Sequence, residues 1–74
     1  MLYDYKIMAW TYKGGTRICY DTVVIQATDR FDAYDKFHSD KFNKVHCVIM
    51  KTDFTERWSV VPGVVHDTWT DMRN

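Results

Sequence analysis

The residues best able to hold a metal ion in this chain are three histidines and two cysteines, His38, His46, His66, Cys19 and Cys47. Structural zinc sites usually carry closely spaced ligand pairs such as C-x-x-C or H-x-x-x-H, and neither spacing occurs in the sequence. His46 and Cys47 are adjacent on an expected strand, so their side chains point to opposite faces. We therefore expect no metal site and no cofactor, with exposed histidines and with cysteines acting as small hydrophobes.

The sequence contains residues that could act as a nucleophile or as a general acid or base, but their spacing does not indicate a catalytic site. A thiol nucleophile needs a nearby base in an accessible, electropositive setting, and nothing in the spacing of Cys47, His38 and His66 demands this. Gly14-Gly15 joins strand to strand and lacks the G-x-x-x-x-G-K-[ST] pattern of a phosphate loop. The carboxylates that could act as acid or base lie on the solvated face of an expected helix: Asp29, Asp32, Asp35 and Asp40. The sequence therefore predicts a protein that is not an enzyme.

Length and composition predict one small folded domain, residues 1–74. Aromatic residues make up 16% of the chain and hydrophobic residues 46%, which suits a small core and is unlike a disordered segment. Ten basic and ten acidic residues give a formal net charge of zero. This balance lacks both the basic excess of most nucleic-acid binders and the acidic excess of a nucleic-acid mimic.

The sequence favours a cytoplasmic protein without a membrane partner. No stretch approaches the roughly 20 apolar residues that cross a bilayer, and the first ten residues do not have the pattern of a signal peptide. Only Cys19 and Cys47 could pair, whereas small secreted domains usually hold several disulfides. A reducing, intracellular setting is therefore expected.

The pattern of residues predicts a ββαββ order. Aromatic and β-branched runs indicate strands at 3–12 and 17–27 around a glycine turn, and further strands at 44–52 and 54–61. A helix is expected between them, beginning after the caps Thr28 and Asp29 and ending near Asn43. Residues 62–74 form a loosely packed tail after the Pro62-Gly63 turn, either as an edge strand or as a helical turn starting near Asp67. The predicted fold is a two-layer α+β domain, an antiparallel sheet of three to four strands with one helix on one face.

The register of the first hairpin decides which residues meet this helix. A two-residue loop would pair Trp10 with Cys19, whereas a three-residue loop with a bulge pairs Tyr5 with Ile25, Ile7 with Val23, Trp10 with Tyr20 and Tyr12 with Ile18. The second register is preferred because it matches the character of the cross-strand pairs. It buries one set of side chains under the helix: Tyr5, Ile7, Val23, Ile25, Ala33, Tyr34 and Phe37.

The same register sends a second set to the face opposite the helix. This set forms a candidate protein interface: Met8, Trp10, Tyr12, Arg17, Ile18 and Tyr20, with Val48 and Met50 joining it if the third strand lies alongside. Contiguous apolar patches of this kind commonly mark interfaces, where Trp, Tyr and Met are enriched. An alternative stays open, in which the tail covers this face with Trp69, Val64 and Val65.

In layout, the stretch TVVIQATDRFDAYDKF, preceded by a hairpin and followed by KVHCVIMKTDF, is similar to many small α+β proteins of bacteriophages. The likeness covers about residues 3–54 and carries no functional residue over. It implies a protein that binds and inhibits a host or defence component.

Taken together, these features predict a small intracellular protein-binding module that acts through the aromatic sheet face. Its partner is a larger host protein or a second copy of itself, as a homodimer. The alternative is a single-stranded nucleic-acid-binding protein that stacks bases on the same aromatic residues. Its phosphate contacts would come from Lys6, Lys13, Arg17, Lys44 and Lys51.

Overall fold

The computed structural model describes residues 1–38 and 45–73, without the side chains of residues 11–13 and 17–21. Within these ranges the elements follow the order ββαβββ: β1 (Tyr3–Lys13), β2 (Thr16–Ala27), α1 (Arg30–His38), β3 (Cys47–Lys51), β4 (Arg57–Val61) and β5 (Thr68–Asp71). The predicted α+β layout with an antiparallel sheet and one helix is therefore confirmed. The predicted number of three to four strands is too low, since the described residues form five strands: the tail adds a fifth after elements that follow the ββαββ order.

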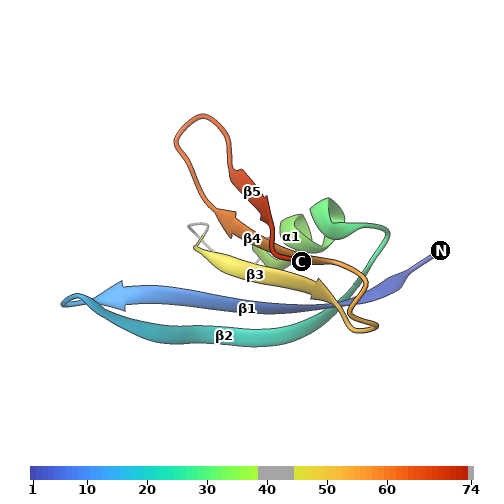
Figure 1. Ribbon diagram of the computed structural model, residues 1–74, viewed down its shortest axis with the longest axis horizontal. Coiled ribbons are helices and arrows are strands. Elements are labelled where there is room, and N and C mark those ends of the chain that lie inside the picture. Colours follow the sequence, from blue (N-terminus) through green and yellow to red (C-terminus); the bar gives the residue numbers. More distant parts are fainter. Residues whose placement is uncertain (39–44, 74) are drawn as a thin grey trace.

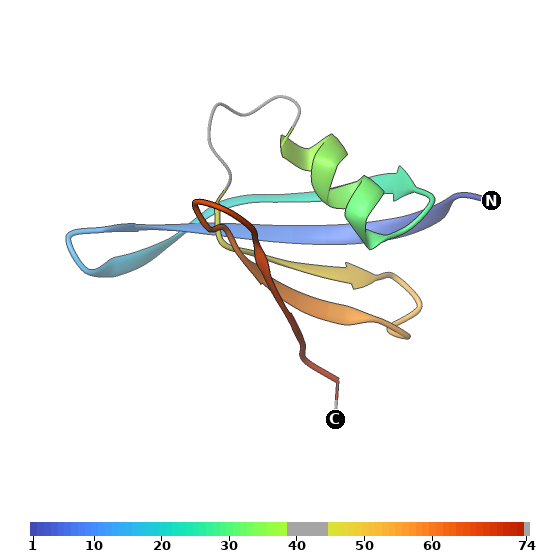
Figure 2. The same cartoon turned by 90° about the horizontal axis from the view of Figure 1, so that it is seen from above.

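The sheet has the strand order β2-β1-β3-β4-β5, and every neighbouring pair is antiparallel. The helix α1 contacts β2, β1 and β3 from one side (Figures 1 and 2). The two strands of the β1–β2 hairpin are longer than the adjacent strand β3, and the tip of the hairpin reaches beyond the end of β3 (Figure 1). The helix therefore covers one side of the sheet near the base of this hairpin.

The β1–β2 hairpin combines the two registers that the sequence left to choose between. Gly14 and Gly15 have φ values of +59° and +80°, which suits a two-residue turn with positive φ at both positions. This turn pairs Trp10 with Cys19, so the expected pairing of Trp10 with Tyr20 is wrong. The expected pairing of Tyr12 with Ile18 is also wrong, because Tyr12 pairs with Arg17.

The register then shifts by one residue between Ala9 and Trp10, and Tyr20 is left without a partner, as in a β-bulge. Below the bulge, the preferred pairs are confirmed: Tyr5 with Ile25 and Ile7 with Val23. The glycine turn therefore sets the register at the tip, and burial of the apolar pairs sets it at the base.

The helix begins at a cap that the sequence predicts. The Asp29 carboxylate accepts a hydrogen bond from Asp32 N–H at 2.8 Å, and the Asp32 carboxylate accepts one from Thr28 N–H at 3.0 Å. The predicted end of the helix near Asn43 falls outside the described residues. None of the helical structure in residues 1–38 and 45–73 has the length and apolarity that a membrane-spanning helix requires.

The core lies between α1 and the sheet, where the predicted stripe of the helix meets the predicted strand residues. Trp69 of β5 packs against this core, with its ring centroid 4.9 Å from that of Phe31 and 5.2 Å from that of Tyr34. The Arg30 guanidinium lies 3.7 Å above the Trp58 ring and ties the helix to β4. The buried residues of this core cluster are Tyr5, Ile7, Ala9, Ala27, Ala33, Tyr34, Phe37, Cys47, Ile49 and Val60.

Two expectations about single residues fail, and one of the two interpretations of the tail is confirmed. Phe54 was expected at the start of the strand 54–61, but it lies in the turn before β4 and is 80% exposed. His38 was expected on the surface and is buried against Tyr34 and Phe37. The edge-strand interpretation of the tail is confirmed by β5, and the helical turn near Asp67 is not formed.

Candidate protein-interaction surface

The side of the sheet opposite α1, here called the reverse face, is built from alternate residues of β1, β3 and β4. One cross-strand row joins Met8, Val48 and Ser59, and the next joins Lys6, Met50 and Arg57. Strand alternation puts these residues on the side away from the buried Ile7 and Ile49 and the half-buried Trp58. The centre of this face is formed by Lys6, Met8, Trp10, His46, Val48, Met50, Arg57, Ser59 and Met72, and Asp4, Thr22, Val24 and Thr70 lie on the same side at its margins.

The centre of the reverse face is a shallow depression of about 320 Å³. Val48 forms its floor and is only 4% exposed, although no helix of the described residues lies on this side. Trp10 and Met8 line it and are half-buried, and the Trp10 ring meets the His46 ring edge-on at 5.8 Å between centroids. The His46 imidazole is fixed in turn by Ser59, at 3.1 Å from Nε2 to Oγ. The rings in this depression are therefore held in place by their neighbours.

A second depression, of about 480 Å³, continues the first along the sheet. Arg57 and Met72 line both, while Met50, Phe54, Glu56 and Arg73 line only the second. Met72 comes from the residues just after β5, and its N–H donates to the Arg57 carbonyl at 2.9 Å. The two depressions thus form one groove with methionines along its length and an aromatic ring near each end.

The middle of the reverse face carries two cations, Lys6 and Arg57, although the whole chain is neutral. Lys6 and Arg57 stand on either side of Met50, and their side chains make no hydrogen bond or ion pair within the described part of the chain. Asp4 lies on the same side of β1 but lines a separate depression with Lys51 and Asp53.

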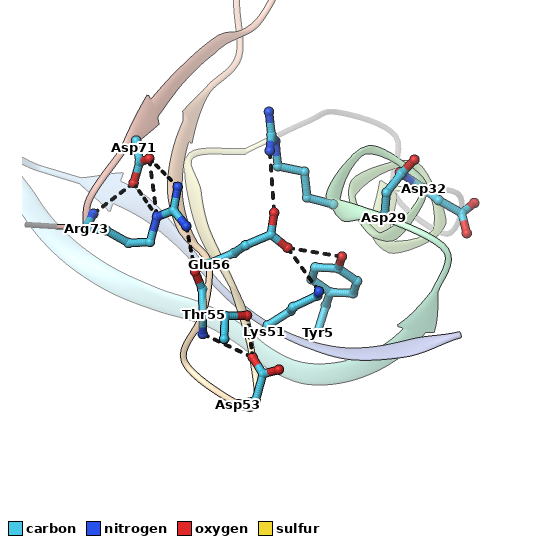
Figure 3. A network of polar contacts seen from close by, with 10 residues as sticks. Tyr5, Asp29, Asp32, Lys51, Asp53, Thr55, Glu56, Asp71 and Arg73 are labelled. Atoms are coloured by element: carbon cyan, nitrogen blue, oxygen red, sulfur yellow. Dashed lines mark hydrogen bonds and ion pairs between the residues drawn. The ribbon is translucent and has the colours of Figure 1, made fainter. Parts of the chain in front are cut away.

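Several carboxylates elsewhere in the molecule are already paired (Figure 3). Glu56 lies on the helix side, 3.7 Å from Arg30, 3.6 Å from Lys51 and 3.5 Å from the Tyr5 hydroxyl. Burial and the charge of Glu56 raise the pKa of Tyr5 to about 12. Hydrogen bonds from Arg73 lower the pKa of Asp71 to about 2. Among the described side chains of the reverse face, Lys6 and Arg57 are therefore the cations that a partner could engage.

The predicted interface residues divide into two groups. Met8 and Trp10 lie on the reverse face, where they are joined by Val48 and Met50 as expected. The side chains of the other four lie outside the described residues: Tyr12, Arg17, Ile18 and Tyr20. Sequence reasoning missed Arg57, Met72 and Phe54. The alternation of β4 could have indicated Arg57, because it is two residues from Ser59 on the solvent side.

The alternative in which the tail covers this face is wrong for the residues it named. Trp69 lies on the helix side of the sheet, and Val64 and Val65 are exposed in the loop between β4 and β5. The contribution of the tail to the reverse face is Met72, which lines the groove.

The candidate nucleophile Cys47 is described in the structure, whereas Asp40 and the side chain of Cys19 lie outside the described residues. Cys47 is a free thiol that is fully buried, and burial followed by the charge of Asp67 raises its pKa to about 12. A nucleophile needs the thiolate, which is then scarce near neutral pH. Among the described residues, no three His, Cys, Asp or Glu side chains gather as metal ligands would.

Comparisons with known proteins leave the surface to be interpreted from its own geometry. The chain matches no protein-family model, no curated protein and no solved structure. The likeness to small bacteriophage proteins therefore stays an expectation from the order of the elements.

Proposed function

We propose that this chain is a small protein-binding module whose reverse face docks on a larger protein. The observation that carries the proposal is the groove of Met8, Trp10, Met50 and Met72 on a side of the sheet that no described helix covers. Methionine and tryptophan are enriched at interfaces, where flexible thioethers adapt to a partner and rigid rings anchor it. A partly buried floor with half-buried walls suits docking better than a flat apolar patch would.

A larger protein is a better partner for this face than a second copy of the chain. Stacking two reverse faces would bring Lys6 and Arg57 of one copy near the same cations of the other, and like charges across an interface disfavour association. In keeping with the layout of the chain, we propose an inhibitor or modulator of a host protein, encoded by a bacteriophage. A cytoplasmic location is part of this proposal and is supported by the reduced, buried Cys47.

A second candidate function is binding of single-stranded nucleic acid. Lys6 and Arg57 accompany Trp10 on one face, and a ring beside cations can stack a base and contact its phosphates. The other expected phosphate contact within the described side chains, Lys51, is paired with Glu56 on the helix side. The two functions are separated by titrating fluorescently labelled oligonucleotides at low and high salt, because phosphate binding weakens steeply with salt.

The proposed function is tested by affinity capture from a lysate of the host cell with three forms of the full chain. Wild type and Phe31→Ala, a control on the exposed part of the helix side, should retain the same protein. Trp10→Ala should lose it while keeping the wild-type circular dichroism spectrum. Equal capture by all three forms would contradict a role for the reverse face. Light scattering of the isolated chain reports a homodimer, the other form of the hypothesis.

A further inference from the structure

Phe54 has a backbone conformation that residues with a Cβ disfavour. Its φ is +64°, in the left-handed region where glycine and asparagine are the usual residues. The turn around it is held by hydrogen bonds: Phe54 N–H donates to the Lys51 carbonyl at 2.9 Å, and Asp53 accepts from Thr55 N–H at 3.0 Å. Strained residues of this kind concentrate at functional sites, where the surrounding structure fixes them.

The same turn holds a large apolar ring in solvent. Phe54 is 80% exposed and lines the groove beside Met50 and Met72. Neither burial nor backbone preference accounts for phenylalanine at this position, where glycine would be unstrained. A ring that inserts into a partner accounts for it, because exposed aromatic anchors supply much of the affinity of interfaces.

The charges of Lys6 and Arg57 indicate which kind of partner could bind this face. Lys6 and Arg57 flank Met50 in one cross-strand row, so neighbouring strand spacings of about 4.8 Å put their backbones about 10 Å apart. With Trp10 at one end of the groove and Phe54 at the other, Arg57 lines its middle, and Lys6 lies beside the groove as the cross-strand partner of Met50.

The geometry points to an acidic, amphipathic segment of a partner protein as the occupant of the reverse face. Its apolar residues would lie between Trp10 and Phe54, and its carboxylates would contact Lys6 and Arg57. This inference rests on the proposed function and adds the chemistry of the partner to it. A nucleic acid would satisfy the cations but would place sugar and phosphate against the methionines, which an apolar side chain fills better.

The test is a selection of linear peptides from a random yeast-displayed library against the immobilised full chain. Selected clones are sorted by whether Trp10→Ala abolishes binding, which identifies those on the reverse face. We expect these clones to carry more Asp and Glu than Lys and Arg, interleaved with aromatic or aliphatic residues. Their affinity for Arg57→Glu should fall about tenfold, and for the control Lys36→Glu, with the same change in net charge on the helix, it should stay within about twofold.

Phe54→Gly gives a second readout that separates docking from folding. Removing the ring should weaken reverse-face clones about tenfold, while relief of the positive φ should raise the thermal midpoint by about 2–5 °C. A purely structural role for Phe54 predicts the opposite, with a lower midpoint and unchanged binding. Either of those two results overturns the role assigned to the ring.

The remaining outcomes separate the acidic chemistry of the partner from the proposed docking function of the reverse face. Reverse-face clones without an acidic excess would overturn the partner chemistry and leave the docking function standing. A selection in which every clone ignores Trp10, or which yields no clone, would overturn both. Binding of a thymidine oligonucleotide that Arg57→Glu abolishes, without acidic peptide clones, would identify a nucleic-acid surface and overturn the inference.

Discussion

The two sides of the sheet should respond differently to the loss of a tryptophan, because one tryptophan belongs to the core and another to the reverse face. Trp69 packs into the core with Phe31 and Tyr34, whereas Trp10 lies on the reverse face against His46. We expect Trp69→Ala to destabilise the fold strongly and Trp10→Ala to do so mildly.

The magnitudes follow from burial. Truncating a fully buried tryptophan to alanine costs about 3–5 kcal/mol of stability. Trp69 is half-buried, so the loss of its buried surface should cost about 2 kcal/mol. Loss of its two closest ring contacts adds about 1 kcal/mol, for a total of about 3 kcal/mol. Trp10 should cost about 1 kcal/mol, since it makes an edge contact with His46 and lies beside an open depression. A chain of 74 residues has only about 4–11 kcal/mol of stability, so the first loss is a large share of it.

The assay is thermal and urea unfolding followed by far-UV circular dichroism, which does not depend on the tryptophans as fluorescence does. At about 4–8 °C per kcal/mol, Trp69→Ala should lower the midpoint by about 12–24 °C and Trp10→Ala by about 4–8 °C. If Trp10→Ala were as destabilising as Trp69→Ala, Trp10 would belong to the core. The binding experiments on the reverse face would then report unfolding.

Three further predictions concern pH and the loop between β4 and β5. Stability should fall as pH rises from about 9 toward about 12, because the pKa of buried Cys47 is raised from 9.0 to about 12 and its neutral form favours the fold. Between these pH values the free energy of unfolding of Cys47→Val, measured with urea, should fall less steeply than that of wild type, by up to about 1.4 kcal/mol per pH unit. Parallel plots of this free energy against pH for the two proteins would refute the prediction. At the acid end, the pKa of Asp71 is lowered from 3.8 to about 2 by Arg73, so its contribution is present above about pH 4 and lost as pH falls toward about 2. Asp71→Asn should flatten the stability curve in that window, and an unchanged slope would show that the pair contributes nothing. Finally, a Cβ on Gly63 would overlap the His66 carbonyl oxygen, so Gly63→Ala should cost about 1–3 kcal/mol, measured by urea unfolding. Val64→Ala in the same exposed loop is the control, and equal stability of the two variants would argue against the clash.

The core between helix and sheet was predictable because local patterns and the tertiary fold agree there. Ala33, Tyr34 and Phe37 share one face of a helix at any plausible helix length, and Tyr5 and Ile7 alternate on a strand. The cap at Asp29 follows from residue type and position alone. These signals depend on neighbours within a few residues, which the sequence displays directly.

The features that sequence reasoning missed depend on competition between distant constraints. The glycine turn favours one register of the β1–β2 hairpin, and the buried pairs at its base favour the other. The bulge at Tyr20 allows both registers in one hairpin, and an analysis that chose one register for the whole hairpin could not find it. Phe54 was misplaced because its aromatic ring has strand propensity, whereas the turn held by Asp53 and Lys51 sets its conformation. Local propensity was overridden in both cases by contacts made elsewhere in the chain.

The last strand connects the stability of the fold to the shape of the candidate interface. Alternation along β5 sends Trp69 into the core beside the helix, while Met72, three residues later, reaches the groove on the reverse side. The Met72 N–H bond to the Arg57 carbonyl fixes this position against the cation that we assign to partner binding. In a domain this small, a residue that closes one face is necessarily close to the other, because a single sheet separates them. The groove is therefore preorganised by the same strand that completes the core, so a partner does not have to order it on binding.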